Sequence, residues 1–95
     1  MTLRAGVDIG TSGVKAALVD ESGGIVIGRA RLDWNDPNDR TEIAPAAIEA
    51  AVLAAVRDAA SRAVGTITSI GVASFAESAV LLDEGDEPLA PVVAW

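Results

Sequence analysis

The sequence predicts a mixed α/β fold, in which a three-stranded antiparallel meander is followed by one helix and further strands. Three short segments with strand-like patterns follow one another at hairpin distance. A longer segment with helical periodicity comes next, and further strand-like segments follow it. With 95 residues, 51% of them apolar, the chain is large enough for one hydrophobic core and too small for two domains.

The meander is predicted over residues 3–9, 14–20 and 25–32, with turn-forming residues at 10–13 and 21–24. Apolar side chains occupy alternate positions of the first segment: Leu3, Ala5, Val7 and Ile9. This period of two is typical of a strand with one buried face. Because the links are short, consecutive strands are expected to pair antiparallel.

An irregular connection, anchored by Trp34, is predicted over 33–44, where Pro37, two Asn and four Asp or Glu occur without periodicity. A helix of about five turns is then expected between Pro45 and Gly65, which suit a first-turn position and a stop. Its apolar face holds Ile48, Val52, Ala55, Val56, Ala59 and Ala63. Because this face is rich in Ala, it permits close approach to a sheet.

The remainder predicts a strand over 67–75, a short apolar run at 79–82, an acidic turn at 83–88 and the start of another strand at 92–95. Since that last segment is apolar, we expect the chain to be the truncated beginning of a longer protein. A complete short protein is the alternative.

The composition excludes several classes of function. Seven basic and fourteen acidic residues give a net charge of −7, which disfavours nucleic acids and anionic membranes as partners. The sequence holds no Cys and no His, which removes disulfides, thiolate metal sites and the commonest general base. No secretion signal or membrane-length apolar run is visible, so a cytoplasmic location is expected.

A candidate nucleotide-phosphate site follows the first strand, and its residues are Asp8, Gly10, Thr11, Ser12, Gly13 and Lys15. The two glycines let the backbone approach an anion, while turn amides and two hydroxyls can donate hydrogen bonds to phosphate oxygens. Asp8 can hold a hydrated Mg²⁺ that bridges the phosphates. Lys15 supplies a compact positive charge.

Other interpretations of this segment remain open from spacing alone. In an ordinary hairpin the glycines would serve only the turn, and Lys15 would be a solvated strand residue. A Walker A loop needs Gly-Lys-Ser/Thr before a helix, and a dinucleotide fingerprint needs Gly-x-Gly-x-x-Gly opening a helix; neither is present. Dispersed arginines (Arg29, Arg31 and Arg40) are interpreted as surface charge, and the acidic cluster 83–87 as a solvated turn.

The run from Asp8 to Lys15 resembles the first phosphate motif of the FGGY family of carbohydrate kinases. A second block continues the resemblance: Ile70-Gly71-Val72-Ala73, Ser74 to Ser78, Leu81-Leu82-Asp83, Glu84 to Leu89 and Pro91-Val92-Val93-Ala94-Trp95. The resemblance implies an actin-like, ribonuclease-H-like fold of two domains, with ATP and sugar in the cleft between them. Residues 1–95 would form the N-terminal part of the first domain.

The resemblance also implies roles for individual residues. Asp8, Gly10, Thr11, Ser12 and Lys15 fall on the family's ATP-phosphate and Mg²⁺ positions. Phe75, Glu77 and Ser78 fall on its substrate loop. Xylulose kinases have Gln-Met-His-Gly at 75–78, so Glu77 replaces their His. Glycerol kinases have Asn-Gln-Arg-Glu in this loop; their Glu matches Glu77, but Ala76 stands in place of their Arg. A sugar or polyol other than glycerol is therefore expected; a solvated Glu77 and a core Phe75 are the alternatives.

The function implied is ATP-dependent phosphorylation of a sugar or polyol hydroxyl. A non-catalytic nucleotide-binding module, or another actin-like ATPase, is the alternative. In the family an Asp and an Arg that contact substrate follow the position of Trp95, and the catalytic Asp begins the second domain. The 95 residues therefore hold no catalytic residue, and we expect them to be inactive in isolation. A homodimer of the full-length protein is one of the assemblies that the resemblance allows.

Overall fold

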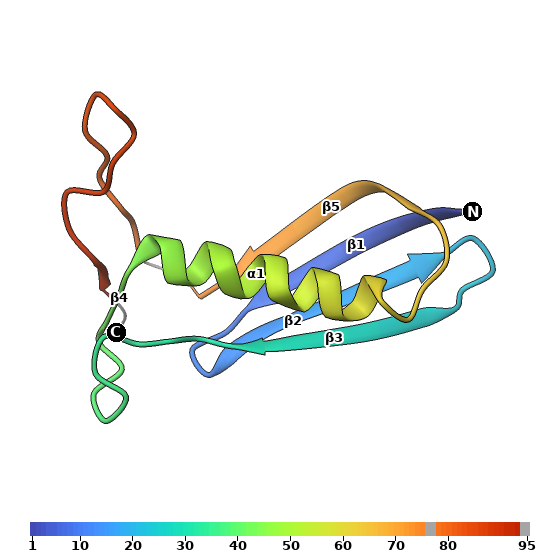
Figure 1. Cartoon of the computed structure of the whole chain (residues 1–95), viewed down its shortest axis with the longest axis horizontal. Coiled ribbons are helices and arrows are strands. Elements are labelled where there is room, and N and C mark those ends of the chain that lie inside the picture. The colour runs from blue at the N-terminus through green and yellow to red at the C-terminus, as the bar shows by residue number, and fades with distance from the viewer. Residues whose placement is uncertain (76–77, 94–95) are drawn as a thin grey trace.

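The computed structural model describes residues 1–75 and 78–93, which contain a four-stranded main sheet with a helix across one face (Figure 1). Its strands are β1 (Thr2–Ile9), β2 (Gly13–Asp20), β3 (Ile25–Arg31) and β5 (Thr66–Ser74), and its helix is α1 (Pro45–Ala60). A second, two-stranded sheet contains β4 (Glu42–Ile43) and β6 (Val92–Val93). The predicted α/β class is confirmed.

The main sheet has the strand order β3-β2-β1-β5. β1, β2 and β3 pair antiparallel in sequence, so the predicted meander is confirmed. β5 pairs parallel with β1, because α1 carries the chain back across the sheet before the strand begins. The carboxyl ends of β1 and β5 therefore lie at the same end of the sheet.

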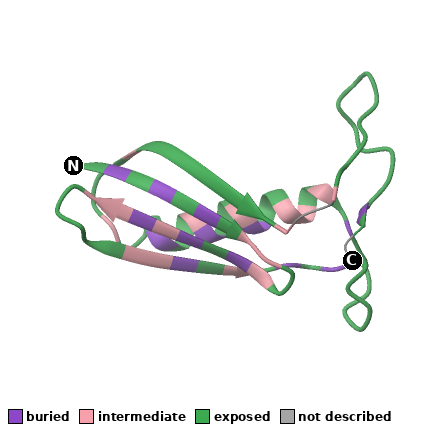
Figure 2. Cartoon of the chain, turned by 180° about the vertical axis from the view of Figure 1, so that it is seen from behind, coloured by how far each residue is buried: buried purple, intermediate pink, exposed green. Residues whose placement is uncertain are grey.

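Alternation along the strands separates a covered face from an open face. In β1 and β2 the side chains beneath the helix are buried: Leu3, Ala5, Val7, Val14, Ala16 and Leu18. The intervening residues of β1 are exposed, which Figure 2 shows as alternating purple and green bands. The open face consequently carries polar side chains, among them Asp8 and Lys15.

The helix approaches the sheet closely at Gly28. Its buried seam consists of Ala51, Ala55 and Ala59, which recur every four residues. The predicted Ala-rich contact is thus confirmed at Ala55 and Ala59, whereas Ala51 was not predicted and the larger residues of the predicted face are only partly buried. A Cβ atom added at Gly28 would overlap backbone atoms of Ala55 and Ala59. The helix has 16 residues, about four and a half turns rather than five, because the chain tightens into a turn after Ala60.

The free edge of β3 is covered by polar groups of α1 and of the turn that follows it. The Arg29 backbone N–H donates to the Asp58 carboxylate at 3.0 Å, and the Arg62 guanidinium donates to the Ile27 carbonyl at 2.7 Å. Asp58 and Arg62 also form an ion pair at 3.2 Å. These contacts satisfy strand groups that would otherwise be open to another chain, and they hold the backbone at Arg29 in place.

The predicted irregular connection 33–44 includes one element that the sequence did not predict. Its last part contains β4, which pairs antiparallel with the distant β6. Trp34, Ile43 and Val92 join the core there. In Figure 1 the loops on either side of this small sheet project from the end of the main sheet that lies away from the N-terminus.

β5 is the least covered strand of the main sheet. Its Ile70 and Val72 side chains are 54% and 61% exposed, although they belong to the same face of the sheet as the core residues of β1. The reason is that α1 lies over β2 and β3 and leaves this edge bare (Figure 2). Within residues 1–75 and 78–93, no helix has the length and apolar character needed to span a membrane.

Candidate functional site

A charged row crosses the open face near the β1–β2 turn. In the antiparallel pairing Asp8 lies opposite Lys15, and Lys15 lies opposite Arg29. Residues paired in this way project from the same face of a sheet, with Cβ atoms about 5 Å apart. Three adjacent strands therefore place one carboxylate and two cations side by side.

The turn between β1 and β2 is short and closed by its own backbone. The Gly10 N–H donates to the Gly13 carbonyl at 2.9 Å. A Cβ atom added at Gly13 would lie 2.6 Å from the carbonyl oxygen of Ala30 on β3. Gly13 therefore has a packing role, since only a residue without a side chain lets the turn lie against β3 here.

The turn is also held from outside by Trp34. The indole Nε1–H of Trp34 donates to the carbonyl oxygen of Thr11 at 2.9 Å, and the Trp34 side chain is buried. The sequence marks Trp34 as an anchor of its own segment, but gives no sign that it contacts the turn 23 residues earlier. The connection 33–44 thus helps to fix the shape of the candidate phosphate loop.

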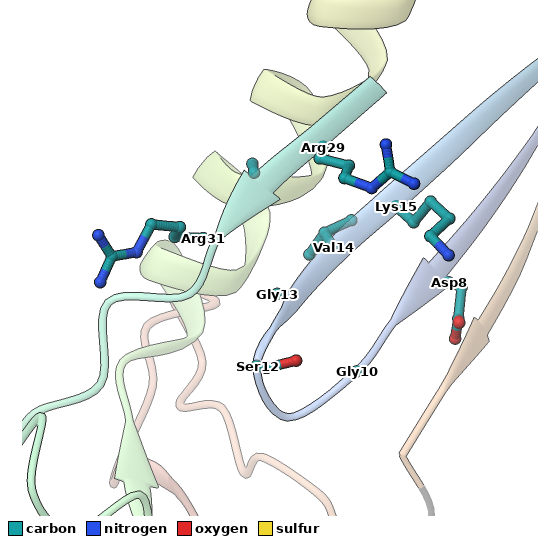
Figure 3. Close-up of a pocket in the computed structure, with 9 residues that line it drawn as sticks. Asp8, Gly10, Ser12, Gly13, Val14, Lys15, Arg29 and Arg31 are labelled. Atoms are coloured by element: carbon teal, nitrogen blue, oxygen red, sulfur yellow. The ribbon is translucent and has the colours of Figure 1, made fainter. Parts of the chain in front are cut away.

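A pocket of about 450 Å³ lies beside this turn (Figure 3). Five of the six predicted phosphate-site residues line it: Asp8, Gly10, Ser12, Gly13 and Lys15. Thr11 does not line it. Arg29 and Arg31 do; both are exposed, as interpreted from the sequence, but they are not dispersed, because they line one pocket. Alternation along β3 and its pairing with β2 were the signals that could have placed Arg29 opposite Lys15 and Arg31 opposite Gly13.

The pocket concentrates positive charge in an acidic chain. Lys15, Arg29 and Arg31 all line the pocket, and Asp8 supplies its carboxylate among the described residues, although the whole chain carries −7. Among the described residues none of these three cations forms an ion pair. The local field therefore favours an anionic ligand, in contrast with most of the surface.

Asp8 is the one acidic side chain that lines the pocket among residues 1–75 and 78–93, and it is exposed. The described residues contain no group of three or more acidic or imidazole side chains that could hold a metal by themselves. A single carboxylate fits Mg²⁺, which keeps several waters and takes its remaining ligands from phosphate oxygens. The donor set is thus suited to a metal that arrives with a nucleotide.

The predicted substrate residues occupy a different place. Phe75 and Ser78 line a smaller pocket of about 170 Å³ together with Ile9 and Ile48, on the helix side of the sheet. Phe75 is half-buried against the core, and the Ser78 hydroxyl donates to the Val93 carbonyl at 2.9 Å. The predicted Glu77 lies outside the described residues.

Comparison with protein families decides the identity. Residues 3–95 match the model of the N-terminal domain of the FGGY family of carbohydrate kinases. The chain belongs to this family. The resemblance of the Asp8–Lys15 motif and of the second block is thereby confirmed at the level of the family, and the actin-like α/β fold with it.

Solved structures of FGGY kinases superpose on almost the whole chain. A xyloylose kinase from Brucella ovis is 36% identical over 98% of the chain, with a TM-score of 0.77. A ligand-bound xylulose kinase from Lactobacillus acidophilus is 26% identical over 100% of the chain, also with a TM-score of 0.77. A gluconate kinase from the same organism is 26% identical over 98%, with a TM-score of 0.73.

The chain spans about one fifth of the length of each of these FGGY kinases, since it covers 20% of each one. A search of curated proteins finds no match. The family and the fold of the described residues are thus shown.

Proposed function

We propose that residues 1–95 form the N-terminal part of the first domain of an FGGY kinase. The complete kinase would transfer the terminal phosphate of ATP to a hydroxyl of a sugar or polyol. The observation that carries this proposal is the pocket beside the β1–β2 turn, where Asp8, Lys15 and the glycine turn come together in a chain of this family.

Each residue of the pocket has a distinct role in the proposal. Lys15 attracts the phosphate oxygens as a compact charge, and Ser12 donates a hydrogen bond from the turn. Asp8 would hold Mg²⁺, which neutralises charge on the phosphates when it is bound. Since phosphoryl transfer depends mainly on positioning and charge stabilisation, these groups would contribute to both at the phosphates.

The acceptor half of the site is proposed to include the loop 74–78. Phe75 and Ser78 line the smaller pocket at the same end of the sheet as the phosphate turn, which supports a substrate lying near the strand ends. Neighbouring structures are named as kinases of xylulose and gluconate, which supports a polyhydroxylated acceptor of similar size. The base that takes the hydroxyl proton is proposed to lie in the second domain.

The test is an ATP-dependent phosphorylation assay of the complete kinase against a panel of sugars and polyols. Asp8→Ala should reduce turnover roughly a hundredfold or more, because loss of one charge-stabilising group costs that much in a preorganised site. Glu49→Ala is the matched control, since Glu49 is an exposed carboxylate on α1 away from the pocket. Normal turnover of a folded Asp8→Ala enzyme would contradict the proposal.

A further inference from the structure

Lys15 and Arg29 form an unfavourable pair unless an anion lies between them. They are directly opposite in the β2–β3 pairing, and both are exposed on the open face. Like charges in this arrangement destabilise a sheet. Asp8, on the other side of Lys15, can balance one of these two positive charges. If Asp8 instead holds Mg²⁺, as proposed above, neither positive charge is balanced by the protein.

Arg29 is held in place by backbone contacts that leave its guanidinium free for another partner. Its N–H is bound to Asp58, and Asp58 is paired with Arg62, so this acid is already engaged on the helix side. Figure 3 shows the Arg29 side chain extending towards Lys15, whereas Arg31 extends away from it. Of the two pocket arginines, Arg29 is therefore the one that extends towards Lys15.

We propose that Arg29 is a second phosphate-binding cation of the nucleotide site, in addition to Lys15. The inference rests on the proposed function, because it places the ATP phosphates over the row from Asp8 to Arg29. That row spans two strand spacings, about 10 Å. The planar guanidinium can bind two phosphate oxygens at once, which a lysine cannot do, so Arg29 would orient the phosphates as well as attract them.

The experiment measures ATP binding and the Michaelis constants for ATP and for the sugar in four variants of the complete kinase: Arg29→Ala, Arg29→Lys, Lys15→Ala and Arg4→Ala. Arg4 is the matched control. It is an exposed arginine on the same open face, but it lies four residues from Asp8 along β1, about 13 Å away. Arg29→Ala keeps the backbone N–H that binds Asp58, so the fold is retained.

Arg29→Ala should weaken ATP binding roughly tenfold, as expected for a charge-assisted hydrogen bond, and leave the Michaelis constant for the sugar unchanged. Arg29→Lys should recover part of the loss, and Arg4→Ala should change ATP binding by less than about twofold. Adenosine, which lacks phosphates, should bind the wild type and Arg29→Ala equally well.

Three results would overturn the inference. If Lys15→Ala weakens ATP binding and Arg29→Ala does not, Arg29 has no phosphate role and the proposed function stands. If Arg29→Ala and Arg4→Ala weaken binding equally, the effect comes from net charge alone. If neither Lys15→Ala nor Arg29→Ala affects ATP binding, the proposed nucleotide site itself is wrong.

Discussion

At the scale of single residues, Trp34 connects the core to the phosphate turn. Its ring packs in the buried cluster while its Nε1–H holds the Thr11 carbonyl at 2.9 Å. Trp34→Phe keeps an aromatic ring but removes the donor. We expect the free energy of unfolding to fall by about 1 kcal/mol and the Michaelis constant for ATP to rise several-fold, because the turn loses its support.

Ile43→Val is the control for Trp34→Phe. It removes one methylene from the same cluster, at a cost of about 1 kcal/mol, without touching the turn. Urea unfolding and steady-state kinetics on both variants separate packing from positioning. Equal changes in the Michaelis constant for ATP would show that the Trp34 hydrogen bond has no functional effect.

Asp20 stabilises the β2–β3 turn in a pH-dependent way. Hydrogen bonds from the Ser22 hydroxyl and from the Gly24 and Ser22 backbone N–H groups lower the pKa of its carboxyl below the ordinary 3.8. The contribution to stability is therefore present above that ordinary pKa and is lost as the pH falls through the folded-state pKa. In urea titrations, the difference between wild type and Asp20→Asn should shrink as the pH is lowered through this range; a constant difference would contradict this.

At the scale of the elements, the contact of α1 with β3 depends on the absence of a side chain at Gly28. Gly28→Ala should lower the free energy of unfolding by about 1–3 kcal/mol, since its methyl group would overlap the backbone of Ala55. Gly71→Ala is the control, because a Cβ atom there meets nothing within 4 Å. Equal stability of the two variants in urea would show that α1 does not pack on β3 in this way.

The strands and the helix were predictable because each has a strong local pattern. Alternation in 3–9 and helical spacing after Pro45 depend on neighbouring residues, and the structure follows both. The pairing of β4 with β6 was not predictable, since two-residue strands about fifty positions apart have no periodicity of their own. For the same reason the arginines of the pocket were missed: their position depends on the register of β3 against β2.

At the scale of the whole molecule, the sheet has more apolar surface than one helix can cover. Ile70 and Val72 remain exposed, and β5 is a free edge. We propose that further parts of the kinase pack against this side, since the chain covers only 20% of its structural neighbours. The 95 residues alone should consequently bind a hydrophobic dye or self-associate.

Paired substitutions test this prediction. Ile70→Asn with Val72→Asn should reduce dye binding and self-association, whereas Val64→Asn should not, because Val64 is an exposed residue of the link between α1 and β5 and not of the strand. Sedimentation and dye fluorescence provide the measurements. A monomeric wild-type chain without dye binding would show that the β5 surface needs no partner.

The central claim is that the pocket beside the β1–β2 turn binds the phosphates of ATP. The most direct measurement is a crystal structure of the complete kinase with Mg²⁺ and a non-hydrolysable ATP analogue. We predict phosphate oxygens within hydrogen-bond distance of Lys15 and the Gly10–Gly13 turn, with the metal on the Asp8 side. Phosphates bound elsewhere, with Asp8 and Lys15 facing solvent, would contradict the claim.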